Sequence, residues 1–266
     1  MKKAISALCI LALLFSFAAC AGHKTPSAPE GTEAPAAGPQ EGALTLRVVD
    51  GAGTGLLVLA GESRDVYPAE SGALTVYLDG GAAAFSDLQN GMLLTVDPDY
   101  TVLETWPGQL VGATVRANGD AGKEDHGDLC GLYLQVLEDL WNEDDGLNGG
   151  VAYISVDLDA APGGLTEGEK AAVAWIFAGR HGAQGLTFGF EELKENGYIK
   201  ENVLYWEDGL LMRIGETEKG SSAGTLRFNA QKWRSGDGAY FFNDCTAARG
   251  KGLSWEPYRV GGFAIS

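Results

Sequence analysis

Residues 129–141, LCGLYLQVLEDLW, mark the change of pattern that decides the fold. Large apolar side chains recur there every three or four residues, the spacing of one face of an α-helix, and Asp128 precedes them as a helix N-cap. Upstream, apolar and polar residues alternate with the period of two that is typical of β-strands. We therefore expect an α+β protein with a β domain over 44–118, a linker over 119–128 and an α+β domain over 129–266.

The predicted β domain consists of short strands separated by turn residues. Alternation of apolar and polar residues is clearest over 44–48, 74–78, 92–96 and 111–117, and a short helix is expected over 82–89. This order of elements predicts a small barrel of the OB type. The segment is similar to OB-like domains in uncharacterised lipoproteins of Gram-positive bacteria.

The charge of this segment argues against nucleic acid as a partner. A groove for single strands needs cationic side chains along the phosphate track. Residues 44–118 contain only Arg47, Arg64 and Arg116 as cations, among a larger number of carboxylates. The whole chain is also acidic, with a formal net charge of −17 that becomes −19 once Lys2 and Lys3 leave with an export signal. This charge opposes binding to nucleic acid and to anionic lipid head groups.

The α+β domain begins with helices and ends in strands. A strand is expected over 151–158, Thr166 and Glu169 form the capping box of a helix that runs through Phe177, and a short helix is expected over 191–195. Further strands are expected over 203–206, 210–214, 224–230, 238–246 and 258–265. This order predicts an antiparallel sheet with the helices on one face, such as the curved sheet of a cystatin- or NTF2-like domain.

Residues 1–20 have the layout of an export signal. A short basic start precedes an apolar run over 4–17, which is shorter than the ~20 residues of a membrane-spanning helix. The end of the run, Ala18-Ala19-Cys20, resembles the lipobox of bacterial lipoproteins. The resemblance implies that Cys20 becomes a lipid-bearing N-terminus, with the membrane as a partner through its lipid. An ordinary secretory signal, cut after Ala21, is the alternative.

The segment that follows the signal is expected to be a tether. Residues 21–43 are rich in Pro, Ala and Gly and have few large apolar side chains, so they cannot form a core. A lipid on Cys20 would place the protein at the outer face of the cytoplasmic membrane, whereas cleavage after Ala21 would give a secreted protein. Cys130 and Cys245 remain after the signal is removed, and they form either one disulfide or two buried thiols.

No catalytic or cofactor signature is present in the sequence. The acidic loop over 142–146 lacks the ligand spacing of a calcium loop, and the histidines show no metal-ligand spacing, so we expect no metal and no cofactor. Asp157 and Asp159 lie on one face of a predicted strand and carry the alternative of a cell-envelope hydrolase with carboxylate chemistry.

Aromatic and cationic residues gather near the C-terminus and form the predicted binding surface: Trp233, Arg234, Tyr240, Phe242, Trp255 and Tyr258. Such side chains line pockets for peptides or glycans, and the competing interpretation is that they pack in the core. We expect a non-enzymatic binding or scaffolding module at the cell envelope, with an envelope protein, peptide or glycan as its partner. A secreted soluble binding protein is a further alternative.

Overall fold

The computed structural model describes residues 43–51, 56–62, 73–79, 85, 87–103, 105–118, 125–200 and 202–266. By their internal contacts, residues 39–266 form one compact unit. The expected signal, Cys20 and nearly all of the tether lie outside the described residues, as does much of the helix expected over 82–89. No helix in the described part of the chain is long and apolar enough to cross a membrane.

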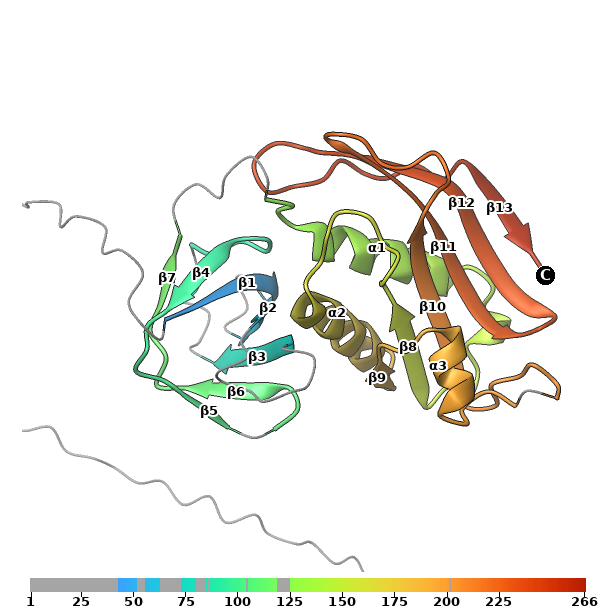
Figure 1. Ribbon diagram of the computed structural model, residues 1–266, viewed down its shortest axis with the longest axis horizontal. Helices are drawn as coiled ribbons and strands as arrows, with labels where there is room; N and C mark the ends of the chain where they lie inside the picture. Colours follow the sequence, from blue (N-terminus) through green and yellow to red (C-terminus); the bar gives the residue numbers. More distant parts are fainter. Residues whose placement is uncertain are drawn as a thin grey trace, which may run out of the picture. The chain divides into compact units, whose positions relative to one another are not determined.

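The structure is of the α+β kind, with two sheets and three α-helices among the described residues. The first sheet comprises β1 (Leu44–Asp50), β2 (Leu56–Glu62), β3 (Ala73–Asp79), β4 (Leu93–Val96), β5 (Thr101–Leu103), β6 (Gly108–Val111) and β7 (Val115–Ala117). Its strand order is β5-β6-β3-β2-β1-β4-β7 (Figure 1). The sequence did not predict β2, and the strand expected over 111–117 is divided between β6 and β7.

The second sheet comprises β8 (Tyr153–Asp157), β9 (Gln184–Leu186), β10 (Gly209–Glu216), β11 (Thr225–Ser235), β12 (Gly238–Ala248) and β13 (Gly262–Ile265). Its order is β13-β12-β11-β10-β8-β9, with β13 at one edge and β9 at the other (Figure 1). The expectation of a purely antiparallel sheet is wrong here, because β8 pairs in parallel with both β9 and β10. The reason is that α2 connects β8 to β9 and α3 connects β9 to β10. A helical crossover returns the chain to the edge of the sheet from which the previous strand began, so the next strand runs in the same direction.

The helices are α1 (Leu129–Asn142), α2 (Glu167–Arg180) and α3 (Phe190–Glu195). Asp128 caps α1 by accepting a hydrogen bond from the Gly131 amide, and α2 opens with the predicted capping box of Thr166 and Glu169. The strand expected over 203–206 is a turn followed by the isolated bridge residue Tyr205, which pairs with Ser235 of β11.

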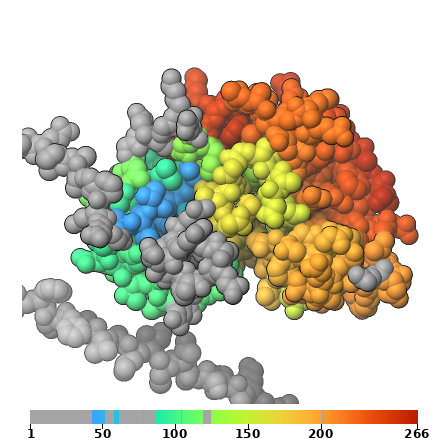
Figure 2. All heavy atoms as spheres, in the orientation of Figure 1, coloured from blue at the N-terminus to red at the C-terminus, as the bar shows by residue number. Residues whose placement is uncertain are grey.

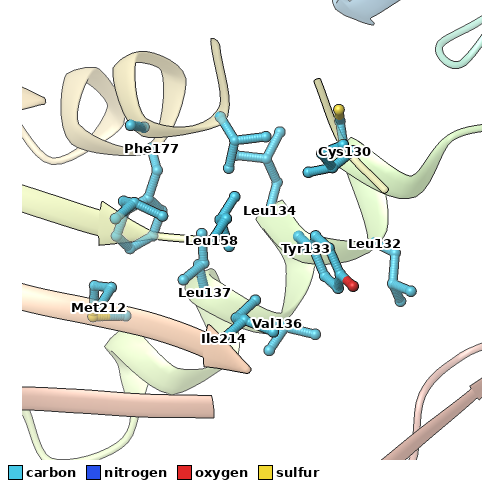
Figure 3. Close-up of a cluster of buried hydrophobic side chains, with 14 of the residues drawn as sticks. Cys130, Leu132, Tyr133, Leu134, Val136, Leu137, Leu158, Phe177, Met212 and Ile214 are labelled. Atoms are coloured by element: carbon cyan, nitrogen blue, oxygen red, sulfur yellow. The ribbon is translucent and has the colours of Figure 1, made fainter. Parts of the chain in front are cut away.

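The main core lies between the second sheet and the pair α1 and α2. Leu137 from α1, Phe177 from α2, and Met212 and Ile214 from β10 meet there (Figure 3). A separate cluster, which includes Trp206 and Trp233, packs beside α3. Side chains alternate across a strand, so Leu211 of β10 joins this cluster while its neighbours Leu210 and Met212 join the main core. The expectation that all helices cover one face is therefore wrong for α3.

Strand β1 is buried on both of its faces. Leu46 and Val48 belong to the core of the first sheet, with Leu59 and Leu94. Val49 instead joins the main core where α2 contacts the first sheet. The stretches expected to form two domains, 44–118 and 129–266, therefore share apolar packing.

A buried ion cluster joins β1 to α2 and to the residues before α1; we call Arg47, Asp125, His126 and Glu169 the Arg47 cluster. Arg47 Nε lies 2.6 Å from Glu169 Oε1, and Arg47 Nη2 lies 2.7 Å from Asp125 Oδ1. His126 Nε2 lies 3.3 Å from the same Glu169 oxygen. Arg47 also donates a 2.7 Å hydrogen bond to the carbonyl oxygen of Gly91. Arg47 is only 7% exposed, so its charge depends on these partners.

Candidate functional site

The predicted aromatic surface is divided between the two faces of the second sheet. Phe242 is 2% exposed and belongs to the main core, with Tyr240 partly buried against it. Trp233 lies on the opposite face, in the cluster beside α3. The six residues therefore do not form one surface, because the alternation of β11 and β12 sends neighbouring side chains to opposite faces.

Arg234 of the predicted set has a structural role. Its guanidinium donates hydrogen bonds of 2.7 Å to the Leu147 carbonyl and 2.6 Å to the Gly149 carbonyl. A third bond, of 2.5 Å, reaches the Glu207 carbonyl. These contacts hold the loop before β8 to the loop before β10. Arg234 is thus occupied by backbone oxygens and is not the anion clamp that an arginine beside aromatics suggests.

Trp255 and Tyr258 do meet at a surface, and they define the first candidate site, which we call the α1 groove. It has a volume of about 510 Å³ and lies between α1 and the segment 254–258. Its lining residues are Asp128, Gly131, Leu132, Gln135, Asp139, Ser254, Trp255, Glu256, Pro257 and Tyr258. The size is in the range of small-ligand pockets, and the lining combines apolar, aromatic and acidic side chains.

Hydrogen bonds fix the aromatic wall of the α1 groove. Trp255 Nε1 donates a 2.9 Å hydrogen bond to the His126 carbonyl, and the Arg249 guanidinium lies 5.2 Å from the centre of the indole ring. Tyr258 Oη donates a 2.8 Å hydrogen bond to Asp139 Oδ2. The two rings are therefore held in place before any ligand arrives, which lowers the entropy cost of binding.

The α1 groove is acidic. Asp128, Asp139 and Glu256 line it, and no lysine or arginine is among its lining residues in the described part of the chain. Burial raises the pKa of Asp128, although the Gly131 amide and the positive charge of Arg47 oppose the increase. Burial, followed by the hydrogen bond to Asp139, raises the pKa of the Tyr258 hydroxyl, which therefore stays protonated as a donor.

The predicted carboxylate pair lies elsewhere, and each member has its own cation. Asp157 Oδ2 lies 3.2 Å from Arg213 Nε, and Asp159 Oδ1 lies 2.8 Å from Lys170 Nζ. Asp157 Oδ1 also accepts a 3.1 Å hydrogen bond from the Asp159 amide. Asp157 is therefore positioned as the partner of an arginine and the acceptor of a turn amide, while Asp159 stays largely exposed.

The acidic loop over 142–146 binds a cation supplied by the chain itself. Lys232 is fully buried, and its ammonium donates hydrogen bonds to the carbonyl oxygens of Trp141, Glu143 and Asp144. Burial lowers the pKa of Lys232 to about 8, against the opposing effect of the nearby acidic residues. Within the described ranges, no group of three or more His, Cys, Asp or Glu side chains is arranged to hold a metal ion.

The histidines and cysteines among the described residues serve the core. His181 stacks on Trp141 with ring centres 3.9 Å apart and lies 3.0 Å from Glu138, while His126 belongs to the Arg47 cluster. Cys130 and Cys245 are both buried free thiols, so the disulfide is not formed in this structure. Burial raises the pKa of both thiols, that of Cys245 to about 12. Cys130 is on α1 and Cys245 on β12, where each fills part of the main core.

Comparisons with known proteins give no family for this chain: no family model, no curated protein and no solved structure matches it. The assignment of a function therefore rests on the residues and geometry above.

The sequence did not predict the Arg47 cluster. In the alternation over 44–48, Arg47 lies on the opposite side from Leu46, and the pattern gives no sign that α2 covers this side. Glu169 was predicted only as the capping-box residue of a helix, and that local role gives no sign of a partner 122 residues away in the chain.

Proposed function

We propose that this chain is an exported, lipid-anchored protein whose folded part is a non-enzymatic binding module at the cell envelope. In this proposal the α1 groove takes a cationic segment of an envelope partner, such as the lysine side chains of a peptide. The observation that carries the proposal is the lining of the groove. Among the described residues it contains Trp255, Tyr258 and three carboxylates and no lysine or arginine, and the one guanidinium close to its aromatic wall is that of Arg249, which lies over the Trp255 ring.

Charge and shape both favour a cationic ligand. An ammonium or guanidinium group gains from the nearby carboxylates and from the face of an aromatic ring, particularly where water is partly excluded. The aliphatic stem of a lysine matches the apolar part of the lining, where Leu132 and Pro257 lie. The net charge of −17, which becomes −19 once Lys2 and Lys3 leave with the signal, also raises the encounter rate with a basic partner.

The anchor and the finer fold assignments belong to the same proposal. Ala18-Ala19-Cys20 supports lipidation at Cys20, and secretion after cleavage at Ala21 is the alternative. An OB-like barrel for the first sheet is supported by its strand order, in which β5 is one edge strand and β4 lies next to the other edge strand. Only residues 97–100 connect β4 to β5, and so short a connection favours a sheet whose two edges curve toward each other. The cystatin- or NTF2-like comparison is supported only by α1 packing against the antiparallel strands β11 and β12.

The binding proposal is tested by titrating tetralysine into the folded protein, with calorimetry and tryptophan fluorescence as readouts. We expect saturable binding that weakens with added salt, since charges near the surface are screened. Trp255→Ala is expected to weaken binding about tenfold, equivalent to roughly 1.4 kcal/mol. Asp139→Asn is expected to weaken it as well.

Two control variants separate the groove from the general acidity of the protein. Trp106→Ala removes a tryptophan that is 61% exposed and lies between β5 and β6. Asp97→Asn removes one carboxylate, which pairs with Arg116. Both variants should bind tetralysine as the parent does. If Asp97→Asn and Asp139→Asn weaken binding equally, tetralysine binding depends on the net charge of the protein. The α1 groove would then not be its binding site.

The hydrolase alternative receives little support from the geometry. Asp157 pairs with Arg213, and Asp159 pairs with Lys170. Hydrolysis by two carboxyl groups requires instead that both face the substrate bond that is cleaved. A double change of Asp157 and Asp159 to asparagine that abolished an envelope-hydrolase activity would restore this alternative.

A further inference from the structure

The groove that holds Asp157 is a second candidate site, distinct from the α1 groove, and we call it the sheet-face groove. It has a volume of about 530 Å³ on the face of the second sheet where α3 lies. Its lining residues are Asp157, Asp159, Gly189, Phe190, Glu191, Glu192, Leu211, Arg213, Gln231 and Trp233. They come from three adjacent strands, from the loop after β8 and from the start of α3.

Strand register builds the floor of the sheet-face groove from two rows of side chains. Leu211 and Trp233 are paired across β10 and β11, and they form an apolar row that is 2% and 7% exposed. Two residues along, Asp157, Arg213 and Gln231 are paired across β8, β10 and β11 and form a polar row. The side chain of Arg213 is 49% exposed, so this row is left open to a ligand.

The position of this groove in the topology favours binding. From β8 the chain crosses to β9 through α2, and from β9 it crosses to β10 through α3, on opposite faces of the sheet. Strand β8 therefore lies between β9 and β10 in the sheet. The connections that leave the carboxyl ends of the neighbouring strands β8 and β9 run in opposite directions along the sheet. Crevices outside the carboxyl ends of parallel strands, at such reversals, are the usual ligand sites of α/β sheets. Asp157 ends β8 at this place.

Charges of both signs face the groove. Arg213 uses Nε to reach Asp157, and this is the only ion pair of Arg213 within the described residues. Asp159 and Glu191, whose side chains are 69% and 73% exposed, form the acidic rim. Lys170 and Lys194 pair with these two carboxylates from outside the lining. The segment around α3, light orange in Figure 2, reaches the molecular surface in the view shown.

We propose that the sheet-face groove binds a small amino-acid zwitterion with an apolar side chain. The carboxylate of the ligand pairs with the guanidinium of Arg213, whose planar donors match a carboxylate. The ammonium group pairs with the acidic rim at Asp159 and Glu191, and the side chain packs against Trp233 and Phe190. A ligand with only a negative charge is repelled by the four lining carboxylates, and one with only a positive charge is repelled by Arg213. A zwitterion has a group of opposite charge available for each of its ends.

The rings under the proposed ligand are rigidly placed. Phe190 and Trp233 contact edge to face with their centres 5.0 Å apart. Asp157 is 6% exposed and holds Arg213 from the buried side, which fixes the guanidinium at the floor of the groove. A preformed aromatic floor beside a held arginine provides orientation without a large ordering cost.

The test is ligand-observed NMR on the folded protein with the twenty common L-amino acids, followed by calorimetry on those that bind. We expect apolar amino acids to bind and their N-acetyl and carboxamide derivatives to bind about tenfold more weakly, because each derivative lacks one charge. Arg213→Gln is expected to weaken binding of the free amino acid by a similar factor.

Arg116→Gln is the matched control, since Arg116 also pairs with one aspartate and its side chain is 47% exposed, but it lies on the first sheet. It should bind amino acids as the parent does, and circular dichroism should show that both variants are folded at the temperature of the binding measurements. The proposal is overturned if no amino acid binds the parent protein. It is also overturned if Arg213→Gln binds normally or if the blocked derivatives bind as well as the free forms.

Discussion

At the scale of single residues, Arg47 contributes more to the free energy of unfolding than its place among alternating polar and apolar residues indicates. It is the only arginine or lysine paired with Glu169 and Asp125 within the described residues, and all three side chains are at least nine-tenths buried. Removal of one member of a buried ion cluster leaves uncompensated charge in a medium of low polarity. We expect Arg47→Ala to lower the free energy of unfolding by about 3–5 kcal/mol in urea titrations.

Arg116 provides the comparison for this prediction. It pairs with Asp97, and its side chain is 47% exposed. An exposed pair contributes only about 0–1 kcal/mol, so Arg116→Ala should unfold close to the parent. Similar losses in the two variants would mean that burial of the Arg47 cluster is not what stabilises it.

Glu169 makes the stability of the protein depend on pH. Burial on its own raises the pKa of Glu169, but the hydrogen bond and charge of His126, the Thr166 amide and Arg47 together lower it to about 2, from 4.5. The unfolded chain then binds this proton more readily than the folded one. The stabilisation is complete above about pH 4.5 and is lost as the pH falls from there toward about 2.

The size of this effect is up to about 3 kcal/mol for Glu169 alone. The lowered pKa of Asp125 acts in the same direction. Urea unfolding at several pH values should therefore show a steeper loss of stability below pH 4.5 for the parent than for Glu169→Gln. Parallel pH profiles for the two proteins would contradict the assignment to Glu169.

At the scale of elements, the start of α2 depends on its capping box. The Thr166 hydroxyl accepts a hydrogen bond from the Glu169 amide at 3.2 Å, and Glu169 Oε2 accepts one from the Thr166 amide at 2.8 Å. We expect Thr166→Ala to lower the free energy of unfolding by about 1 kcal/mol, because one amide of the first turn loses its acceptor. Thr166→Ser keeps the acceptor oxygen and should stay within a few tenths of a kcal/mol of the parent in the same urea titration.

At the scale of the whole molecule, we propose that a lipid on Cys20 attaches the folded unit to a membrane. We expect the chain expressed in a bacterial host to carry lipid on Cys20, seen as added mass on the intact protein and as partition into the membrane fraction. Cys20→Ala should lose both the added mass and the membrane fraction, because it removes the thiol to which the lipid would be attached. An unmodified N-terminus at Gly22 would show instead that the protein is secreted.

The α+β class and α1 were predictable because they depend on local signals. The spacing of apolar residues and Asp128 set α1, and Thr166 with Glu169 set the start of α2. The parallel pairing of β8 with β9 and β10 was not predictable, since β9 spans only Gln184–Leu186 and has no alternating pattern of its own. Part of the candidate sites followed from composition: Trp255 and Tyr258 meet in one groove, and Asp157 with Trp233 in the other.

The sequence by itself determined what depends on neighbours in the chain: the periods of strands and helices, the caps, the turns and the acidic charge. Only the tertiary structure decided which residues from distant segments meet. Arg47 and Glu169 are 122 residues apart, and nothing local to either reveals the other. Strand alternation divides the aromatic residues between two faces, but only the packing of α1 and α3 decides what covers each face. Local propensity fixes the elements, whereas burial of their apolar faces against one another fixes the sites.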